Sequence, residues 1–302
     1  MCNVTFVIDE SGAKGYADKR ENVVGELGVV AGYFIPNTCL PKAQSDLSDI
    51  AKKYRWNNKC HIADLNPGDQ DLLRSDIFAY LLSVQARWTY EAMYVDGFHS
   101  GERLASEIIR AAKERRSSNV RVSRNKREEA LLHVELFKGA FGKAMAFCVD
   151  NFGQPVCINV MTDKVGKSTL NKFHKGADRL LSIGNPKITK VSGFDPDTGA
   201  FVKGTITSEI TDGAELLGDF SGVQYGIEES PSVLTLAADV LANSVHHYLR
   251  LLQKLTPGCP LNTARSISGH PLSSIAYDTS VDGVEASQVA DTIFRHPNRS
   301  NV

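Results

Sequence analysis

The sequence lacks the features that are typical of secreted and membrane proteins. Its six cysteines are scattered and none forms a Cys-x-x-Cys pair, which argues against a disulfide framework. Nothing resembles a signal peptide, and no apolar run reaches the roughly 18 residues of a membrane-spanning helix. We therefore expect a cytoplasmic protein with reduced thiols and no membrane contact. Cys60 and His61 could bind zinc with distant partners, but the usual spacing of zinc ligands is absent.

Net charge is almost absent as well. The chain has 34 Lys and Arg against 35 Asp and Glu, a formal charge of −1. The molecule as a whole is therefore not committed to nucleic acid or to a membrane, and such a preference must come from local patches. With 302 residues, 42% hydrophobic and 23% charged, the composition is that of a globular protein that can bury a sizeable core.

The spacing of apolar residues predicts mixed strands and helices, an α/β protein. Strands are expected over 3–9, 27–35, 88–95, 155–163 and 222–228, with a hairpin over 188–207 around Asp-Pro-Asp-Thr-Gly. Helices are expected over 43–54, 69–86, 101–116, 127–149, 168–181 and 231–255, the last capped by Ser230 with Pro231 in its first turn.

The chain divides near its C-terminus. Residues 1–255 hold the predicted strands and helices and form one domain. Residues 256–302 are rich in Ser, Pro, Asn, Gly and His, and their apolar periodicity is weak. We expect a C-terminal extension that packs on the domain or is partly disordered.

Three aspartates occupy positions that a buried strand or helix would otherwise fill with apolar residues. Asp9 ends the run VTFVI, Asp163 ends PVCINVMT, and Asp239 interrupts LAADVL. The ends of adjacent parallel strands lie about 5 Å apart, and sites in α/β sheets form at carboxyl ends of strands. A divalent cation would offset the repulsion between Asp9 and Asp163 and the cost of burying Asp239.

Each acid also has a purely structural interpretation. Strand-end aspartates commonly cap turns, and Asp239 could face solvent or pair with an arginine. Side chains alternate along a strand, so Glu10 should point away from Asp9 as a supporting or turn residue. Ser11 fits a turn hydroxyl better than a nucleophile, because no nucleophile elbow surrounds it.

Two motifs carry a family resemblance. VIDESG at 7–12 and SPSVLTLAADVLANSV at 230–245 resemble the two signature ends of the bacterial domain-of-unknown-function family 3800, which is similar to the ribonuclease H-like superfamily. The resemblance spans roughly residues 3–250, and element order alone matches in the middle. It implies a mixed sheet of three antiparallel and then parallel strands, with helices on both faces.

The resemblance also implies a ligand set. In ribonuclease H-like proteins a first-strand aspartate, a helix glutamate, a fourth-strand aspartate and a late-helix acid bind two Mg²⁺ or Mn²⁺ ions. On this sequence the corresponding residues are Asp9, Glu135, Asp163 and Asp239. Glu129 is an alternative to Glu135, and Asp150 is an alternative to Asp163.

The implied chemistry is hydrolysis of phosphodiester bonds in RNA or DNA. Two cations about 4 Å apart would clamp the scissile phosphate, and carboxylates supply the oxygen ligands that such cations prefer. Lys164 is a candidate for a basic catalytic helper, as are Lys59 and His61. Each of the three could equally be a solvated side chain.

A basic segment is the other signal for nucleic acid. Between Arg110 and Arg127 eight basic residues stand against one acid, Glu114, and such segments neutralise phosphates in a salt-sensitive way. The candidate contacts are Arg115, Arg116, Arg121, Arg124, Lys126 and Arg127. An exposed loop or an interface with an acidic partner would have the same composition, and the segment has too few aromatic residues for a base-stacking platform.

Two further hypotheses remain. The chain could be a nucleic-acid- or partner-binding module without turnover, in an anti-phage or mobile-element operon that also encodes a protein partner. A costly carboxylate cluster argues against a pure binder. The chain could also be a metal-dependent phosphoesterase that acts on nucleotides instead of polymers.

Overall fold

The computed structural model of the chain describes most of its residues. The described ranges are 1–13, 20–54, 61–114, 121–122, 131–182, 187–208, 220–277, 280–281, 284–285 and 288–297.

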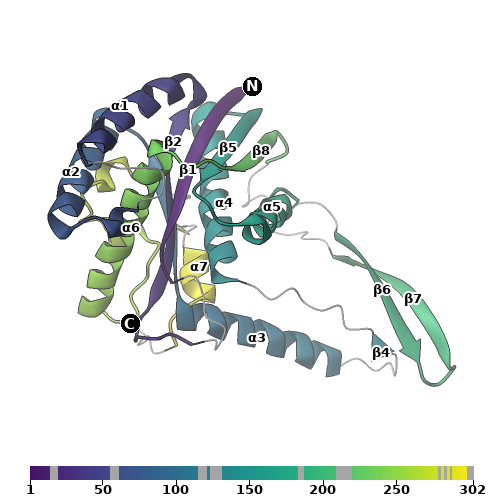
Figure 1. The fold of residues 1–302 in the computed structure, drawn as a ribbon. Coiled ribbons are helices and arrows are strands. Elements are labelled where there is room, and N and C mark those ends of the chain that lie inside the picture. The colour runs from purple at the N-terminus through teal and green to yellow at the C-terminus, as the bar shows by residue number, and fades with distance from the viewer. Residues whose placement is uncertain are drawn as a thin grey trace.

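A five-stranded mixed sheet forms the centre of the molecule, in the order β3-β2-β1-β5-β8 (Figure 1). The first three strands in this order are antiparallel, and β5 and β8 run parallel to β1. This confirms the predicted α/β class with antiparallel and then parallel strands. The strands are β1 (Cys2–Gly12), β2 (Leu27–Pro36), β3 (Trp88–Tyr94), β5 (Val156–Thr162) and β8 (Val223–Glu229).

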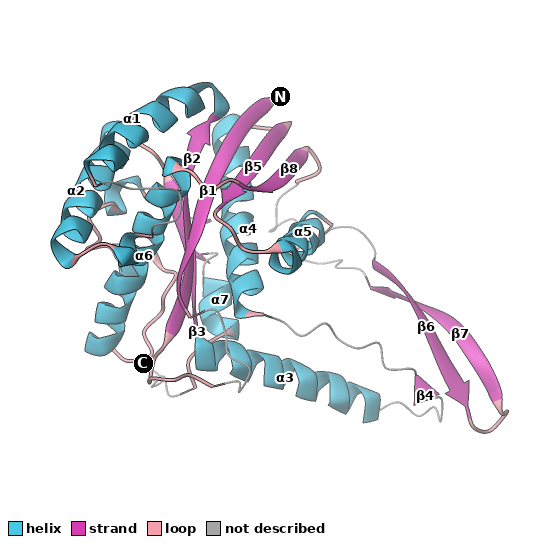
Figure 2. Cartoon of the chain, viewed as in Figure 1, coloured by secondary structure: helices cyan, strands magenta, loops and turns pink. Residues whose placement is uncertain are grey.

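Helices cover both faces of this sheet (Figure 2), which is why residues 4–8 of β1 are an unbroken buried run. On one face, Val7 and Tyr33 belong to a core shared with α1 (Leu40–Lys53), α2 (Pro67–Ser83) and α6 (Val233–Leu255). On the other face, Phe6 and Ile8 belong to a core shared with α4 (Leu132–Phe152) and α5 (Lys167–Leu181).

The predicted hairpin is present and forms a second, smaller sheet. It consists of β6 (Lys187–Asp195) and β7 (Ala200–Ser208), and it projects away from the central sheet in Figure 1. A third, unpredicted strand, β4 (Arg121–Val122), pairs with β6 so that Arg121 lies opposite Phe194. The hairpin thus carries part of the basic segment.

Several predicted helix boundaries are wrong by a few residues. Helix α3 (Val95–Glu114) begins directly after β3, six residues before the predicted start at residue 101. Helix α4 begins at Leu132 and not at residue 127. Helix α6 begins at Val233, and its N-cap is Ser232 instead of Ser230. The Ser232 N–H donates to Thr235 Oγ1 at 2.9 Å, which fixes the start of α6 two residues after Pro231.

The described part of the C-terminal segment packs on the domain. Leu261, Leu272 and Ile275 are buried in the core that contains α6, and Trp88 Nε1 donates to the Leu272 carbonyl at 2.8 Å. The segment continues through β9 (Ser280–Val281), β10 (Val284–Glu285) and α7 (Gln288–Ile293). It therefore contributes to the same apolar core as the central sheet.

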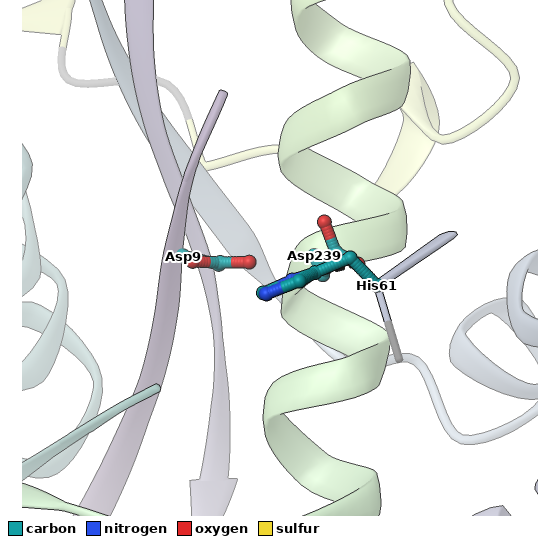
Figure 3. A group of neighbouring side chains, drawn as sticks. All are labelled: Asp9, His61 and Asp239. Atoms are coloured by element: carbon teal, nitrogen blue, oxygen red, sulfur yellow. Dashed lines mark ion pairs between the residues drawn. The ribbon is translucent and has the colours of Figure 1, made fainter. Parts of the chain in front are cut away.

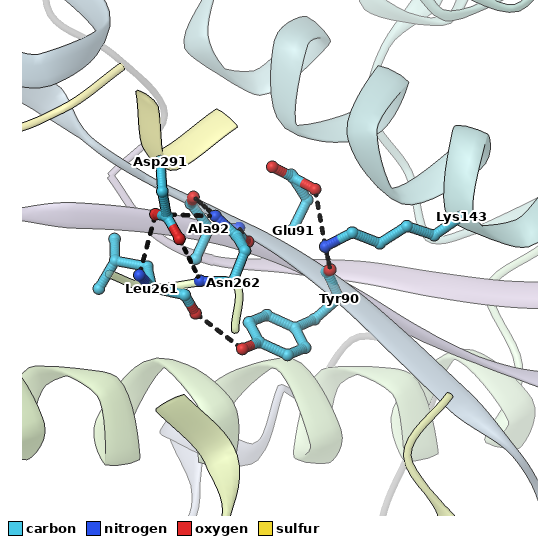
Figure 4. A network of polar contacts seen from close by, with 7 residues as sticks. All are labelled: Tyr90, Glu91, Ala92, Lys143, Leu261, Asn262 and Asp291. Atoms are coloured by element: carbon cyan, nitrogen blue, oxygen red, sulfur yellow. Dashed lines mark hydrogen bonds and ion pairs between the residues drawn. The ribbon is translucent and has the colours of Figure 1, made fainter. Parts of the chain in front are cut away.

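A polar network ties α7 and this segment to β3 (Figure 4). The Asp291 carboxylate accepts hydrogen bonds from the backbone N–H groups of Leu261 and Asn262, both at 2.9 Å. The Asn262 amide in turn pairs with the backbone of Ala92, and Tyr90 Oη donates to the Leu261 carbonyl. In the described part of the chain, no helix is long and apolar enough to cross a membrane, and the five described cysteines are free.

Candidate metal centre

Strand pairing brings Asp9 and Asp163 to the same edge of the sheet. Strands β1 and β5 are parallel neighbours, and Ile8 pairs with Thr162. The next residues, Asp9 and Asp163, are therefore level with each other where the pairing of β1 with β5 ends, as the sequence predicts, although β1 itself continues to Gly12. Asp9 is 7% exposed, and Asp163 is half-buried in the turn after β5.

Helix α6 brings Asp239 to this edge from the face of the sheet that it covers. Its Oδ2 accepts a hydrogen bond from the Ile62 backbone N–H at 2.7 Å and lies 3.7 Å from His61 Nδ1. Figure 3 shows the His61 ring directed toward Asp9. One ligand atom from each of Asp9, His61 and Asp239 lies within 4.8 Å of the other two, close enough for all three to reach a single cation.

Burial and nearby negative charges raise the pKa values of Asp9 and Asp239. Burial raises the pKa of Asp9 well above its usual value, and the negative charges of Asp239, Glu10 and Asp163 raise it further. Burial likewise raises the pKa of Asp239, although the Ile62 N–H and His61 partly counteract this. Among the residues that the structure describes, no lysine or arginine forms an ion pair with these three aspartates. A bound cation would supply the missing positive charge.

Asp163 lies near the group formed by Asp9, His61 and Asp239 but is not one of its members. Its Oδ1 accepts the backbone N–H of Lys164 at 2.8 Å, and its charge raises the pKa of both Asp9 and Asp239. The following turn is fixed by Glu229 at the end of β8, whose Oε1 accepts the N–H groups of Val165 and Gly166 at 3.1 and 2.8 Å. Of the two acidic residues at the ends of β5 and β8, Asp163 therefore lies near Asp9 and Asp239. Glu229 instead holds the turn after β5.

Glu10 behaves as strand alternation predicts. Strand β1 continues to Gly12, so Glu10 points to the opposite face from Asp9. There its Oε2 lies 2.8 Å from His133 Nε2 of α4.

Glu135, the implied helix ligand, lies in the first turn of α4, on the same face as Glu10. Its Oε2 contacts Lys138 Nζ at 2.5 Å, and no described contact joins it to Asp9. Glu129 lies outside the described residues. The role of Glu135 as a ligand stays a prediction.

Among the described residues, the other candidates make no side-chain contact with the three aspartates. The Lys164 side chain is exposed, and the Lys164 contact with Asp163 is made by its backbone. Lys59 and Cys60 lie outside the described residues. Asp150 lies in α4, before the amino end of β5, and accepts a hydrogen bond from Tyr277 Oη at 2.5 Å. Asp163 is thus the residue at the carboxyl end of β5.

The structure describes little of the basic segment. Arg121 belongs to β4, and only its backbone is described. The other predicted contacts lie outside the described residues: Arg115, Arg116, Arg124, Lys126 and Arg127. Their role in binding nucleic acid stays a prediction.

The sequence did not predict that His61 lies beside Asp239. From the sequence, His61 is a possible zinc ligand together with Cys60 and one of several candidate basic helpers. In the structure it precedes a short 3-10 helix, Ile62–Asp64, whose first N–H group binds Asp239. This backbone contact places the imidazole beside the carboxylate, and the sequence pattern gives no sign of it.

The chain was compared with known proteins. No protein-family model matches it, and no curated protein is similar in sequence. The family resemblance of the two motifs therefore stays a prediction.

Proposed function

We propose that the chain is a divalent-metal-dependent nuclease of ribonuclease H-like fold that hydrolyses phosphodiester bonds of RNA or DNA. The observation that carries this proposal is the meeting of Asp9, Asp163 and Asp239 at one edge of the sheet, without a described lysine or arginine to pair with them. The sheet order and the helices on both faces are compatible with the fold that the two motifs imply.

The residues fit a metal ion in chemistry and in placement. Asp9, His61 and Asp239 would hold one ion, and Asp163 beside Asp9 would contribute to a second. Carboxylate oxygens suit Mg²⁺ and Mn²⁺, and an imidazole ligand favours Mn²⁺ over Mg²⁺. When bound, such ions activate water and stabilise charge on the phosphate.

The protein's own residues prepare this site. Asp9 is held by the Glu10 backbone N–H at 2.8 Å and Asp239 by the Ile62 N–H at 2.7 Å, so both carboxylates are oriented before a metal binds. His61 is 55% exposed and sits on the open side of the cluster. It is therefore placed to bind either the metal or an incoming phosphate.

The smaller sheet supports a nucleic-acid substrate. Phe201 on β7 is 82% exposed, and its ring lies 5.4 Å from that of Phe194 on β6. Arg121 of the basic segment pairs with Phe194. This brings aromatic side chains next to Arg121, one residue of the basic segment, and a combination of basic and aromatic side chains suits single-stranded nucleic acid.

The test uses Asp9→Asn and Asp239→Asn with Glu10→Gln as the matched control. Cleavage of RNA and DNA oligonucleotides is measured with Mn²⁺, with Mg²⁺ and with chelator. We expect each aspartate variant to lose about 10³-fold or more in rate, several kcal/mol of transition-state stabilisation. Glu10→Gln should retain activity because Glu10 faces α4. Full activity in both aspartate variants would rule out the proposed site.

A binding module without turnover is the second candidate. It is favoured by the position of Glu135, which contacts Lys138 and has no described contact with the aspartates. Calorimetric titration with Mn²⁺ separates the two functions. Metal uptake that disappears in Asp9→Asn supports the nuclease, whereas oligonucleotide binding without any carboxylate-dependent metal uptake supports the binder.

A further inference from the structure

A second group of metal-ligating side chains lies away from β5 and α6. It consists of Glu21 from the connection between β1 and β2, Asp96 from the first turn of α3, and His296 after α7. One ligand atom from each lies within 4.8 Å of the other two. The group is not a set of surface acids, because the Glu21 side chain is 10% exposed and that of His296 is 4% exposed.

The distances within this group suit a shared cation better than a direct hydrogen bond. His296 Nε2 lies 3.4 and 3.5 Å from the two carboxylate oxygens of Glu21, beyond the common range of about 2.7–3.2 Å for N–H···O hydrogen bonds. Two ligand atoms that each lie about 2.0–2.1 Å from a tetrahedral zinc ion are about 3.4 Å apart. The nitrogen and the oxygens are thus separated as two ligands of one ion would be.

Backbone groups hold the two carboxylates in place. Glu21 Oε2 accepts the N–H groups of Gly25 and Glu26 at 2.9 and 3.2 Å, and Asp96 Oδ1 accepts the Glu21 N–H at 3.1 Å. Among the described residues, Asp96 Oδ2 has no hydrogen-bond partner. Ligand carboxylates that are themselves hydrogen-bonded are typical of metal sites.

Close packing of the C-terminal segment on α3 delivers His296 to this position. A Cβ atom at Gly97 would lie 1.9 Å from the Phe294 carbonyl oxygen, and one at Gly101 would lie 2.9 Å from that of Ile293. Only glycine at Gly97 therefore lets the segment approach so closely. On the other side, Asp291 anchors α7 to residues 261–262 (Figure 4), and the Tyr94 ring meets the His296 ring edge-on.

We propose that Glu21, Asp96 and His296 bind a divalent transition-metal ion of the zinc class. An imidazole with two carboxylates favours Zn²⁺ over Mg²⁺, which prefers oxygen ligands. The ion joins three segments that are far apart in the chain: the connection after β1, the start of α3 and the end of the C-terminal segment. Its role is structural, and it shares no residue with the Asp9 site.

The experiment measures zinc content and thermal stability in an Asp9→Asn background, which disables the first site. After equilibration with Zn²⁺ and dialysis, we expect Asp9→Asn to retain one zinc ion per chain and to melt several degrees higher than with chelator. Addition of His296→Gln should abolish both effects. His247→Gln, which alters an exposed histidine on α6, should abolish neither.

Two results would overturn the proposal. One is an Asp9→Asn protein that retains no zinc. The other is a folded Asp9→Asn/His296→Gln protein that retains zinc as before. If His296→Gln does not fold, Asp96→Asn decides in its place, because Asp96 lies in the half-exposed first turn of α3. Undiminished zinc content in that variant also overturns the site. Neither result depends on whether the Asp9 site cleaves nucleic acid.

Discussion

Acidic residues on the α4 face of the central sheet are paired with basic side chains, whereas most of those at the edge near α6 are not. On the face covered by α4, each of three glutamates lies within 3 Å of a basic side chain: Glu10 with His133, Glu91 with Lys143 and Glu135 with Lys138. At the edge near α6, Asp9, Asp163 and Asp239 gather with His61 as the one basic side chain in described contact. The negative charges on the α4 face are thus balanced by basic side chains of the protein. Those near α6 lack such partners, and a bound cation can balance them.

Other histidines on the α6 side do not supply that charge. Burial lowers the pKa of His246 and of His270 to about 4, so both are neutral near pH 7. Acidic residues that are paired within the protein stabilise the fold. Acids that are gathered without a partner mark the candidate site.

The largest expected effect breaks the pairing on the α4 side. The Lys143 and Glu91 side chains are 12% and 3% exposed, so Lys143→Met leaves a buried carboxylate alone. We expect a loss of about 3–5 kcal/mol in the free energy of unfolding, measured by urea denaturation at pH 7. Glu91→Gln added to this variant should restore much of the loss because no charge then remains.

The control for this prediction is an exposed ion pair. Lys42→Met removes the partner of Asp46, which lies 2.7 Å away on α1, and should cost at most about 0.5 kcal/mol. If Lys143→Met costs no more than Lys42→Met, the buried pairing does not support the fold.

A smaller effect tests the neutral histidines on the α6 side. His270 Nδ1 accepts the Leu272 N–H at 3.2 Å, and Nε2 lies 3.0 Å from Ser244 Oγ, so the folded ring is neutral. The pKa falls from 6.5 to about 4 on folding, so between these values the unfolded state binds more protons. Stability is therefore full above pH 6.5 and falls as the pH drops toward 4, by about 2 kcal/mol between pH 7 and 5.

Urea denaturation at pH 7 and pH 5 measures this dependence. The difference between the two pH values should shrink in His270→Gln and stay unchanged in His247→Gln, whose histidine is exposed. An identical pH dependence in His270→Gln and the unmodified protein would mean that His270 is protonated as easily folded as unfolded.

A third prediction concerns the electrostatic repulsion among Asp9, Asp163 and Asp239. In chelator, Asp9→Asn should be more stable than the unmodified protein by about 1–2 kcal/mol, because one of three mutually repelling charges is gone. Mn²⁺ should raise the melting temperature of the unmodified protein more than that of Asp9→Asn, which keeps only the Glu21, Asp96 and His296 group. Glu10→Gln, which loses its contact with His133, should gain no stability in chelator. A destabilised Asp9→Asn would show that the carboxylate is already balanced within the chain.

The smallest effect concerns His61. Because this imidazole is 55% exposed, His61→Ala should change the free energy of unfolding in chelator by less than about 0.5 kcal/mol. Its Mn²⁺ affinity in calorimetric titration should nevertheless fall about tenfold. His247→Ala serves as the control, and equal affinities in the two variants would remove His61 from the metal site.

The sequence predicted the sheet well because β1, β2, β3 and β5 are rich in apolar residues and largely buried. Asp9 and Asp163 could be placed together because parallel neighbouring strands end at one edge. Asp239 stood out because it interrupts the apolar surface of α6. In these places the local pattern determines the three-dimensional position.

What the sequence could not predict depends on packing between distant segments. The contact of Glu10 with His133 follows from the packing of α4 on the sheet, and the position of His61 follows from a backbone contact with Asp239. The pairing of β4 with β6 joins segments about 70 residues apart. No local pattern identifies partners at such separations.

The contact between Asp239 and the Ile62 N–H has a consequence for biosynthesis. Ile62 leaves the ribosome long before Asp239 does, and Asp9 leaves earlier still. A nascent chain therefore holds the first halves of the site well before α6 exists to complete it. Non-local assembly of this kind delays completion until most of the polypeptide has been made, so the proposed metal centre can form only late in synthesis.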